Sequence, residues 1–468
     1  MRLITGTRVS LVTLVLFCFG LRFQANASAL PDAPVPQNQP VGAQTTGQTT
    51  STPASTVTGT AHLLTRREAE QIALANNPAI HISQLLTKIQ HQVVRERRAD
   101  EMPNLVGNLT VVGAKEDSRL AAGSVTSSAL FNHAGEGLEL RQLVTDFGRT
   151  ANLIATANLL EKARVADAQA SRDDIVLAVD QVFYQTIGAQ ETLKVAIETV
   201  AARQTVTDQV SALTASKLRS ELDLSFAQVN LSQAQLLQLD AQGNLDSAKA
   251  ALSDVLGFDK QMDYELVEES NELPALAPDS GVLIAQAIAN RPDLHALTYN
   301  EQAARKFSRA QHEQLLPTIS ALGVVGQIPI GSSQFFVSDW YGAIGANLSI
   351  PIFNGFRFSA QATEARQQAQ VASEQTRALR DRVVRDVRTA WLNANTALQR
   401  VTVTAALLKE SNTALDLAST RYKFGLSSIV ELSQAQLQQT SAAIGSATAQ
   451  AQYKLSIAAL NFEIGVLQ

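Results

Sequence analysis

The sequence contains one cysteine among 468 residues, Cys18, and it lies in an apolar run near the start of the chain. Removal of that run would leave no disulfide and no thiolate metal site. The six histidines lack metal-ligand spacing, and there is no phosphate loop, dinucleotide fingerprint or Gly-x-Ser-x-Gly elbow. We therefore predict a protein that is not an enzyme and has no cofactor and no metal.

The N-terminal region is not expected to belong to the fold. Residues 1–27 combine a basic start with an apolar run too short to span a bilayer, and small residues suit cleavage after position 27 or 29. We predict a signal peptide here, followed by a flexible linker over 28–62, rich in Pro, Gln and Thr. Cleavage would remove three arginines and move the formal net charge from -5 to -8, so nucleic-acid binding has no electrostatic support.

The rest of the chain repeats itself. Residues 73–78 recur in similar form at 287–292, and residues 223–228 recur at 431–436 with a slightly smaller spacing. A register that changes once, by six positions, indicates a duplicated architecture in which one loop differs in length, between Pro103 and Asp146. The predicted division is repeat 1 at 63–262, a connector at 263–280 and repeat 2 at 281–468.

Each repeat contains exceptionally long helical segments. Residues 148–216 contain no proline and a single interior glycine, Gly188, so they predict a rod about 100 Å long. Residues 223–256 would return antiparallel to it, and segments 356–424 and 430–464 repeat the pair. Aromatic residues make up only 5% of the chain, and small residues fill the helices, which favours a wall one helix thick. A soluble coiled coil would need sustained apolar heptads, which are patchy here.

Between the helices, each repeat has two alternating segments, at about 103–146 and 317–353. Runs of about ten residues suit tilted strands of an outer-membrane barrel, but alternation fits an ordinary hairpin equally well. The long helices favour the membrane interpretation. Four strands cannot close, whereas three chains would supply twelve, enough for an aqueous lumen. Aromatic residues near the strand ends are candidates for a membrane-interface girdle: Phe131, Phe335, Phe336, Trp340 and Tyr341.

The order of several short motifs resembles the TolC-like outer-membrane efflux protein family over nearly all of residues 63–468. The carriers are the duplicated helix start at Pro78 and Pro292, the Leu-Pro strand entry at 316–317, the strand exit at 351–355 and the segment 421–428. The resemblance implies a mainly α fold with a transmembrane β-barrel portion: a homotrimer with a twelve-stranded barrel in the outer membrane of a Gram-negative-type bacterium and a long periplasmic helical tunnel. It also implies a periplasmic adaptor and an inner-membrane pump of the RND or ABC type as partners.

The resemblance places adaptor docking at two helix-hairpin turns. The positions are Lys217, Leu218, Arg219 and Ser220 in the first turn, and Gly425, Leu426, Ser427 and Ser428 in the second. Gly425 suits a helix end because glycine enters the left-handed conformation without penalty. Lys217 replaces that glycine in the first turn and leaves its geometry open. The alternative is two ordinary turns that bind no partner.

The resemblance also implies a periplasmic gate at the tunnel's closed end. Glu431 matches the first acidic position of the family, whereas Gln434 stands at the second, so three chains would form one ring of carboxylates that attracts cations. Tyr422 and Asp223 match positions that tie neighbouring coils shut. Ser427 stands where some members place a basic partner, so the latch is only partly matched. A solvated helix charge is the alternative for Glu431.

Two functions remain open at this stage. The first is a channel-tunnel that serves as the passive exit duct of a tripartite efflux or type I secretion system, opened at its periplasmic end by the adaptor and pump. The second is a periplasmic coiled-coil adaptor or scaffold without a pore. The transported substrate and the pump class are not encoded in any of these motifs.

Overall fold

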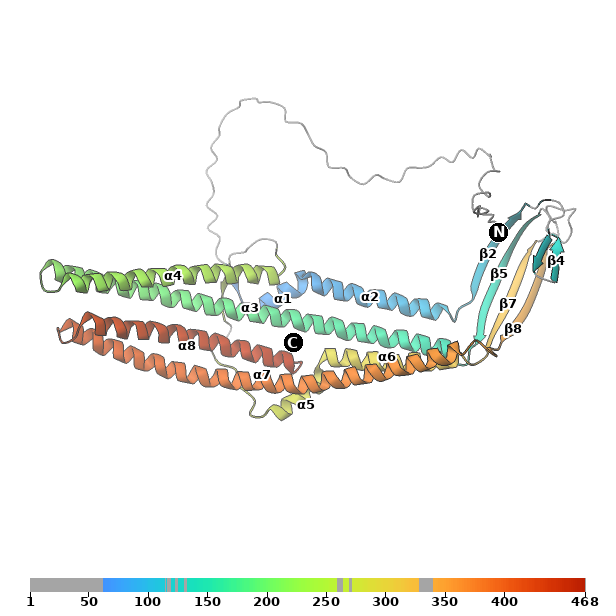
Figure 1. The fold of residues 1–468 in the computed structure, drawn as a ribbon. Helices are drawn as coiled ribbons and strands as arrows, with labels where there is room; N and C mark the ends of the chain where they lie inside the picture. The colour runs from blue at the N-terminus through green and yellow to red at the C-terminus, as the bar shows by residue number, and fades with distance from the viewer. Residues whose placement is uncertain are drawn as a thin grey trace, which may run out of the picture. The chain divides into compact units, whose positions relative to one another are not determined.

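The computed structural model describes residues 62–113, 115, 119–122, 125–129, 133–258, 264–268, 272–327 and 340–467 (Figure 1). The chain divides into two units, Met1–Thr58 and Gly59–Gln468, and all described residues belong to the second. The predicted signal peptide and all of the predicted linker except His62 lie outside the described residues. So do Phe131, Phe335 and Phe336.

The duplication is confirmed element by element. Each repeat runs helix, helix, strand, strand, long helix, shorter helix. The first repeat contains α1 (Arg66–Asn76), α2 (Pro78–Ala99), β2 (Asn104–Val112), β5 (His133–Thr145), α3 (Arg149–Ala215) and α4 (Glu221–Val255). The second contains α5 (Ser280–Asn290), α6 (Pro292–Glu313), β7 (Thr318–Gln327), β8 (Tyr341–Ser349), α7 (Arg357–Lys423) and α8 (Ile429–Glu463). The predicted long helices are confirmed as α3 and α7, each of 67 residues.

The change of register falls within the strand region of the first repeat. The starts of β2 and β7 keep the spacing that relates 73–78 to 287–292, whereas the starts of β5 and β8 keep the spacing that relates 223–228 to 431–436. The differing loop therefore lies between Val112 and His133, and it contains the short strands β3 (Arg119–Ala122) and β4 (Val125–Ala129), which pair as a hairpin. Two further short strands, β1 (His62–Leu64) and β6 (Tyr264–Leu266), pair in parallel.

The junction between the first two helices of each repeat ties down the end of the shorter hairpin helix. In the first repeat the Asn77 side chain accepts from the Ala79 N–H at 2.9 Å, which caps α2, and its Nδ2 donates to the Val255 carbonyl at the end of α4. Arg291 stands at the equivalent place, and its Nη1 donates to the Glu463 carbonyl at the end of α8, at 3.3 Å. Both contacts satisfy a carbonyl that has no partner within its own helix.

The helices form a wall, and its order follows from which helices pack together. Along the half that contains the hairpin turns, α3 packs against α4 and α8, and α7 packs against α8, which gives the order α4–α3–α8–α7. Along the other half the order is α2–α3–α6–α7 (Figure 1). The predicted wall one helix thick is confirmed. Its two lateral edges are unlike: α2 and α4 form one, and α7 forms the other.

Two small cores lie where α1 packs against α3 and where α5 packs against α7. They are built from equivalent positions of the two repeats, since Phe183 corresponds to Trp391 and Val179 corresponds to Val387. The connector crosses these cores: the Trp391 indole donates to the Ala277 carbonyl at 2.8 Å. These cores place α1 and α5 on one face of the wall.

The four long strands form one antiparallel sheet in the order β2-β5-β7-β8. The alternation predicted from the sequence is confirmed: one face carries apolar side chains, and the other carries most of the polar ones. The apolar face is exposed, and Ile344 is 94% accessible. The apolar side chains are Leu105, Leu109, Leu138, Leu140, Val325 and Ile344, and the polar ones include Asn108, Thr110, Glu139 and Arg141. Within the described part of the chain, β2 and β8 are the free edges of this sheet.

Among the described helices, none is both long enough and apolar enough to pass through a membrane.

Candidate functional site

The two hairpin turns have the same backbone geometry. Lys217 and Gly425 are both left-handed, with φ of 60° and 74°. The Leu218 N–H donates to the Leu213 carbonyl at 2.9 Å, and the Leu426 N–H donates to the Arg421 carbonyl at 2.8 Å. The lysine therefore adopts the glycine conformation, at a conformational cost of roughly 1 kcal/mol.

The helices that follow the turns begin with side-chain caps. Ser220 accepts from the Asp223 N–H at 3.1 Å, and the Asp223 carboxylate accepts from the Ser220 N–H, which completes a capping box. Ser428 caps α8 by accepting from the Glu431 N–H at 3.3 Å. The segment from the end of α3 to the start of α4 is thus held at both ends.

The two turns lie close to each other because a small hydrophobic cluster joins all four helices near them. Its buried members are Val210 of α3, Ala227 of α4, Tyr422 of α7, and Ile429 and Leu432 of α8. Beyond it, the Asn230 Nδ2 donates to Ser433 Oγ at 2.7 Å, from α4 to α8.

Tyr422 is the centre of this region. Its side chain is 6% exposed, and its hydroxyl is buried without a hydrogen-bond partner in the described part of the chain. The Arg219 guanidinium lies over its ring at 4.3 Å from Cζ to the centroid, and Arg219 Nη2 donates to the Tyr422 carbonyl at 2.8 Å. Burial raises the pKa of Tyr422; the guanidinium opposes that shift and Asp223 reinforces it.

The predicted gate residues divide into two groups. Tyr422 and Asp223 come together, as their electrostatic interaction shows. Glu431 instead lies beside Arg421 on the exposed side of α8, with 3.4 Å between Arg421 Nε and Glu431 Oε1. Gln434 is exposed on the same helix. The predictions placed Arg219 only in a docking turn and missed its contact with Tyr422. The available signal was a basic residue in the first turn at the position that Ser427 occupies in the second.

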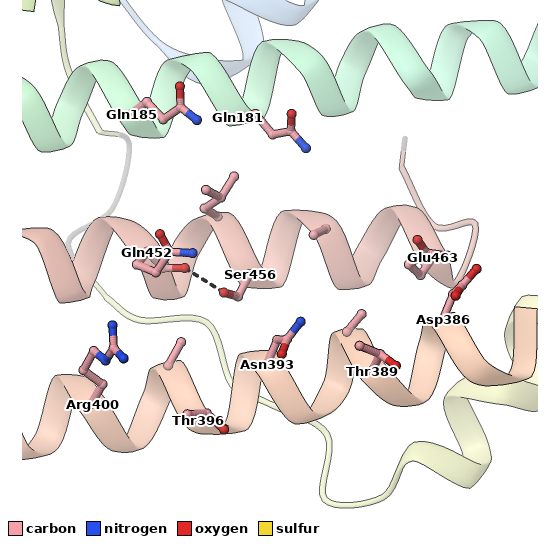
Figure 2. Close-up of a pocket in the computed structure, with 14 residues that line it drawn as sticks. Gln181, Gln185, Asp386, Thr389, Asn393, Thr396, Arg400, Gln452, Ser456 and Glu463 are labelled. Atoms are coloured by element: carbon pink, nitrogen blue, oxygen red, sulfur yellow. Dashed lines mark hydrogen bonds between the residues drawn. The ribbon is translucent and has the colours of Figure 1, made fainter.

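A second feature, missed from the sequence, is a groove of about 730 Å³ between α3, α7 and α8 (Figure 2). Uncharged polar side chains dominate its lining, with Arg400 towards one end and Asp386 and Glu463 towards the other (Figure 2). The uncharged polar residues are Gln181, Gln185, Thr389, Asn393, Thr396, Gln452 and Ser456.

The groove has a sequence signal in the duplication. Gln185 and Asn393 occupy equivalent positions of the two repeats, and Gln452 is the counterpart of Asn244, which lines the adjoining pocket. Both repeats thus place a carboxamide at the same two helical positions. On α3 the groove residues lie about half a turn from Phe183, which packs in the core under α1. The groove therefore lies on the opposite face of the wall from α1 and α5.

Comparison with known proteins decides what this architecture belongs to. Residues 70–258 and 283–466 match the family described as outer membrane efflux protein. The chain belongs to this family. It is 26% identical to the outer membrane protein OprJ of Pseudomonas aeruginosa over 366 residues, which cover 77% of this chain and 75% of that protein. The outer membrane efflux protein BepC of Brucella suis is 23% identical over 374 residues, 78% of this chain and 77% of the relative.

Solved structures show the same fold. The outer-membrane channel OprN aligns with a TM-score of 0.73 at 19% identity, over 86% of this chain and 89% of that one. The open state of the MtrE channel of Neisseria gonorrhoeae aligns with a TM-score of 0.71 at 19% identity, over 86% and 88% of the two chains.

The family resolves the alternatives left by the sequence. The chain is an outer-membrane efflux channel of tripartite systems rather than a periplasmic adaptor without a pore. The resemblance to the TolC-like family is confirmed, and so is the location in the outer membrane. Members of this family are channel proteins and not enzymes.

Proposed function

We propose that the chain assembles as a homotrimer whose twelve long strands close into a barrel and whose helical walls close into a passive exit duct. The observation that carries this proposal is the mismatch of the two lateral edges. β2, α2 and α4 lie on one edge, and β8 and α7 lie on the other. Unlike edges associate head to tail, and such a contact closes into a ring when the rotation between copies allows it.

The free strand edges support the closure. In lipid, the backbone groups of β2 and β8 need partners, because no water is present to satisfy them. Joining β8 of one copy to β2 of the next removes every free edge of the long sheet. The exposed apolar face of the sheet would then contact outer-membrane lipid, with Trp340 and Tyr341 near the membrane interface.

The helical edges also expose apolar side chains. Leu236 and Leu239 lie on the side of α4 away from α3, and Leu417 lies on the side of α7 away from α8. Their exposed fractions in the single chain are 58%, 69% and 59%. Contact between α4 of one copy and α7 of the next would cover them.

In this ring the groove of Figure 2 would face the axis. The layer made by α1, α5 and their cores adds thickness to one face of the wall, and the outside of a ring offers the room for it. The opposite face carries Gln185, Asn393 and Gln452, so the passage would be lined by uncharged carboxamides. Such a lining suits a passive conduit whose substrate is selected elsewhere.

The hairpin turns would form the periplasmic end. We propose that Glu431 forms a ring of three carboxylates there, with Gln434 beside it. The region around Tyr422 and Asp223 would hold the end closed. The turns would dock a periplasmic adaptor, which links the duct to an inner-membrane pump of the RND or ABC type. The docking residues are Lys217, Leu218, Arg219, Ser220, Gly425, Leu426, Ser427 and Ser428.

The test combines assembly with conductance. The full chain, purified in detergent, should run as a trimer by mass photometry and should produce discrete conductance steps in planar bilayers. Leu236→Asp should lower the trimer fraction because it buries a charge in the proposed seam. Val165→Asp is the matched control, since Val165 is 54% exposed but lies on the central helix α3. A monomeric wild type without conductance would rule the proposal out.

A further inference from the structure

The segment between α3 and α4 holds one side chain in a well-defined position. Lys217 follows α3 in a left-handed turn, and Ser220 starts α4 with a capping box. Arg219 lies between these two fixed points. Its backbone is therefore held from both sides, and its side chain extends to the other hairpin, where it meets Tyr422.

The Arg219 guanidinium contacts the end of α7 in two ways. The Tyr422 carbonyl lies in the last turn of α7, where the helix dipole favours a positive charge, and it accepts from Arg219 at 2.8 Å. The same guanidinium covers the face of the buried Tyr422 ring at 4.3 Å. An arginine can make both contacts because the face of its planar guanidinium stacks on the ring while an N–H at its edge donates a hydrogen bond to the carbonyl.

The tyrosine hydroxyl takes no part in this contact. It is buried without a hydrogen-bond partner among the described residues. The carboxylate of nearby Asp223 accepts from the Ser220 N–H and so belongs to the cap of α4. The ring face and the backbone carbonyl of Tyr422 are thus the two groups through which it meets Arg219 of the other hairpin.

We propose that Arg219 is the latch of the periplasmic end: its guanidinium clamps the last turn of α7 to the α3–α4 turn and keeps the two hairpins of one chain together. This inference rests on the proposed function as a gated duct. Arg219 of the first repeat acts here as a positioning residue. The latch uses its guanidinium on the ring and the carbonyl of Tyr422, in place of a contact between the Tyr422 hydroxyl and the Asp223 carboxylate.

The duplication extends the inference to the seam between copies. Ser427 is the counterpart of Arg219 in the second repeat, and Thr214 is the counterpart of Tyr422 in the first. In the proposed ring, Ser427 of one copy would therefore face Thr214 of the next. Two short hydroxyl side chains cannot form the clamp. The seam between copies would therefore lack the clamp that holds the two hairpins of one chain together.

The experiment uses the full chain in planar bilayers and measures the fraction of time that single channels stay open without an adaptor. Arg219→Gln should raise that fraction roughly tenfold, and Arg219→Lys should raise it less because the charge remains. Tyr422→Phe should match wild type, since the ring and the carbonyl remain. Lys423→Gln is the matched control: it removes a charge from the exposed side of the last turn of α7, next to Tyr422, and should leave the open fraction at the wild-type value.

Three outcomes would overturn the latch. The first is an open fraction in Arg219→Gln equal to that of wild type. The second is an open fraction in Tyr422→Phe as high as that in Arg219→Gln, which would show that the tyrosine hydroxyl keeps the end closed. The third is an open fraction that merely follows a lowered melting temperature across the Arg219 variants. If neither wild type nor any variant conducts, the proposed function as a duct is wrong. Thr214→Tyr with Ser427→Arg would install the same clamp across the seam and should lower the open fraction. No decrease would contradict the clamp as a closing contact.

Discussion

The two cores under α1 and α5 occupy equivalent places in the two repeats but are stabilised differently. In the second repeat the core is apolar, with Leu283 of α5 packed against Val387 of α7. In the first repeat an ionic cluster joins the core: Arg66 Nη1 lies 2.7 Å from a Glu70 oxygen and 3.2 Å from an Asp180 oxygen. One backbone arrangement therefore accepts either solution, because packing and paired charge can both fill the space between two helices.

The difference follows from single positions. The duplication places Ile284 of the second repeat at the position of Glu70, and Arg388 at the position of Asp180. Asp180 is 1% exposed, so its charge depends on Arg66 for compensation. Burial raises the pKa of Asp180, and the neighbouring guanidinium opposes that shift. The first repeat therefore depends on pH and on Arg66 in a way that the second does not.

The largest effect should come from Arg66→Ser, which introduces the residue type found at the equivalent position of the second repeat, Ser280. It removes the cation that compensates the buried Asp180 carboxylate and should destabilise the chain by roughly 3 kcal/mol. The measurement is the melting temperature in detergent, by calorimetry. Ser280→Arg is the control in the second repeat and should have little effect, because Ile284 and Arg388 stand at the positions of the two carboxylates there. An unchanged melting temperature for Arg66→Ser would show that the cluster is not part of the stabilising core.

The pH dependence of stability sharpens the same comparison. Burial, reinforced by Asp180 and opposed by Arg66 and Arg67, raises the pKa of Glu70 to about 7. The folded chain thus binds the carboxyl proton of Glu70 more tightly than the unfolded chain does. The stabilising contribution of this proton is complete below the ordinary glutamate pKa of 4.5 and is lost as pH rises through about 7.

Melting temperatures at a series of pH values, from well below to well above the raised pKa of Glu70, would test this. The wild type should lose stability as pH rises, and Glu70→Gln should flatten the profile because the amide cannot ionise. Tyr184, whose pKa burial raises to about 12, does not titrate there. A Glu70→Gln profile as steep as that of wild type would place the titrating group elsewhere.

The two hairpin turns form a second comparison, with a smaller effect. Lys217→Gly should stabilise the chain by about 1 kcal/mol because it relieves a left-handed lysine. Gly425→Ala should destabilise it by a similar amount, since a Cβ there meets open space and only the conformation is penalised. Chemical unfolding of both variants would measure the two values. If both substitutions changed the free energy of unfolding in the same direction, the two turns would differ in conformation.

The smallest effect concerns the groove. Asn244→Lys and Gln452→Lys change equivalent positions and should each shift ion selectivity modestly towards anions, because both would line the passage. Reversal potentials in a salt gradient would show the shift, and high salt should weaken it. A shift for one variant and none for the other would mean that the two repeats do not share a lumen-facing side.

Several features were predictable because they depend on local pattern. The absence of proline between 148 and 216 predicted α3, and the change in repeat spacing located the loop that contains β3 and β4. The alternating segments predicted the two faces of the sheet. The basic residue at position 219 was visible in the sequence, but its contact with Tyr422 was not, because the two residues are far apart in the chain and meet only when the hairpins pack. The groove was also missed, since its carboxamides resemble solvated positions on any long helix.

The sequence by itself determined the duplication, the long helices, the four strands and the turns that join them, because each follows from spacing, from residues that break helices and from residues that tolerate special backbone angles. The tertiary structure alone decided which faces meet: that α8 lies between α3 and α7, that one core uses charge where the other uses packing, and that an arginine of one hairpin holds a tyrosine of the other. The physical reason is that contacts between distant segments depend on how whole helices pack, and no local pattern records that.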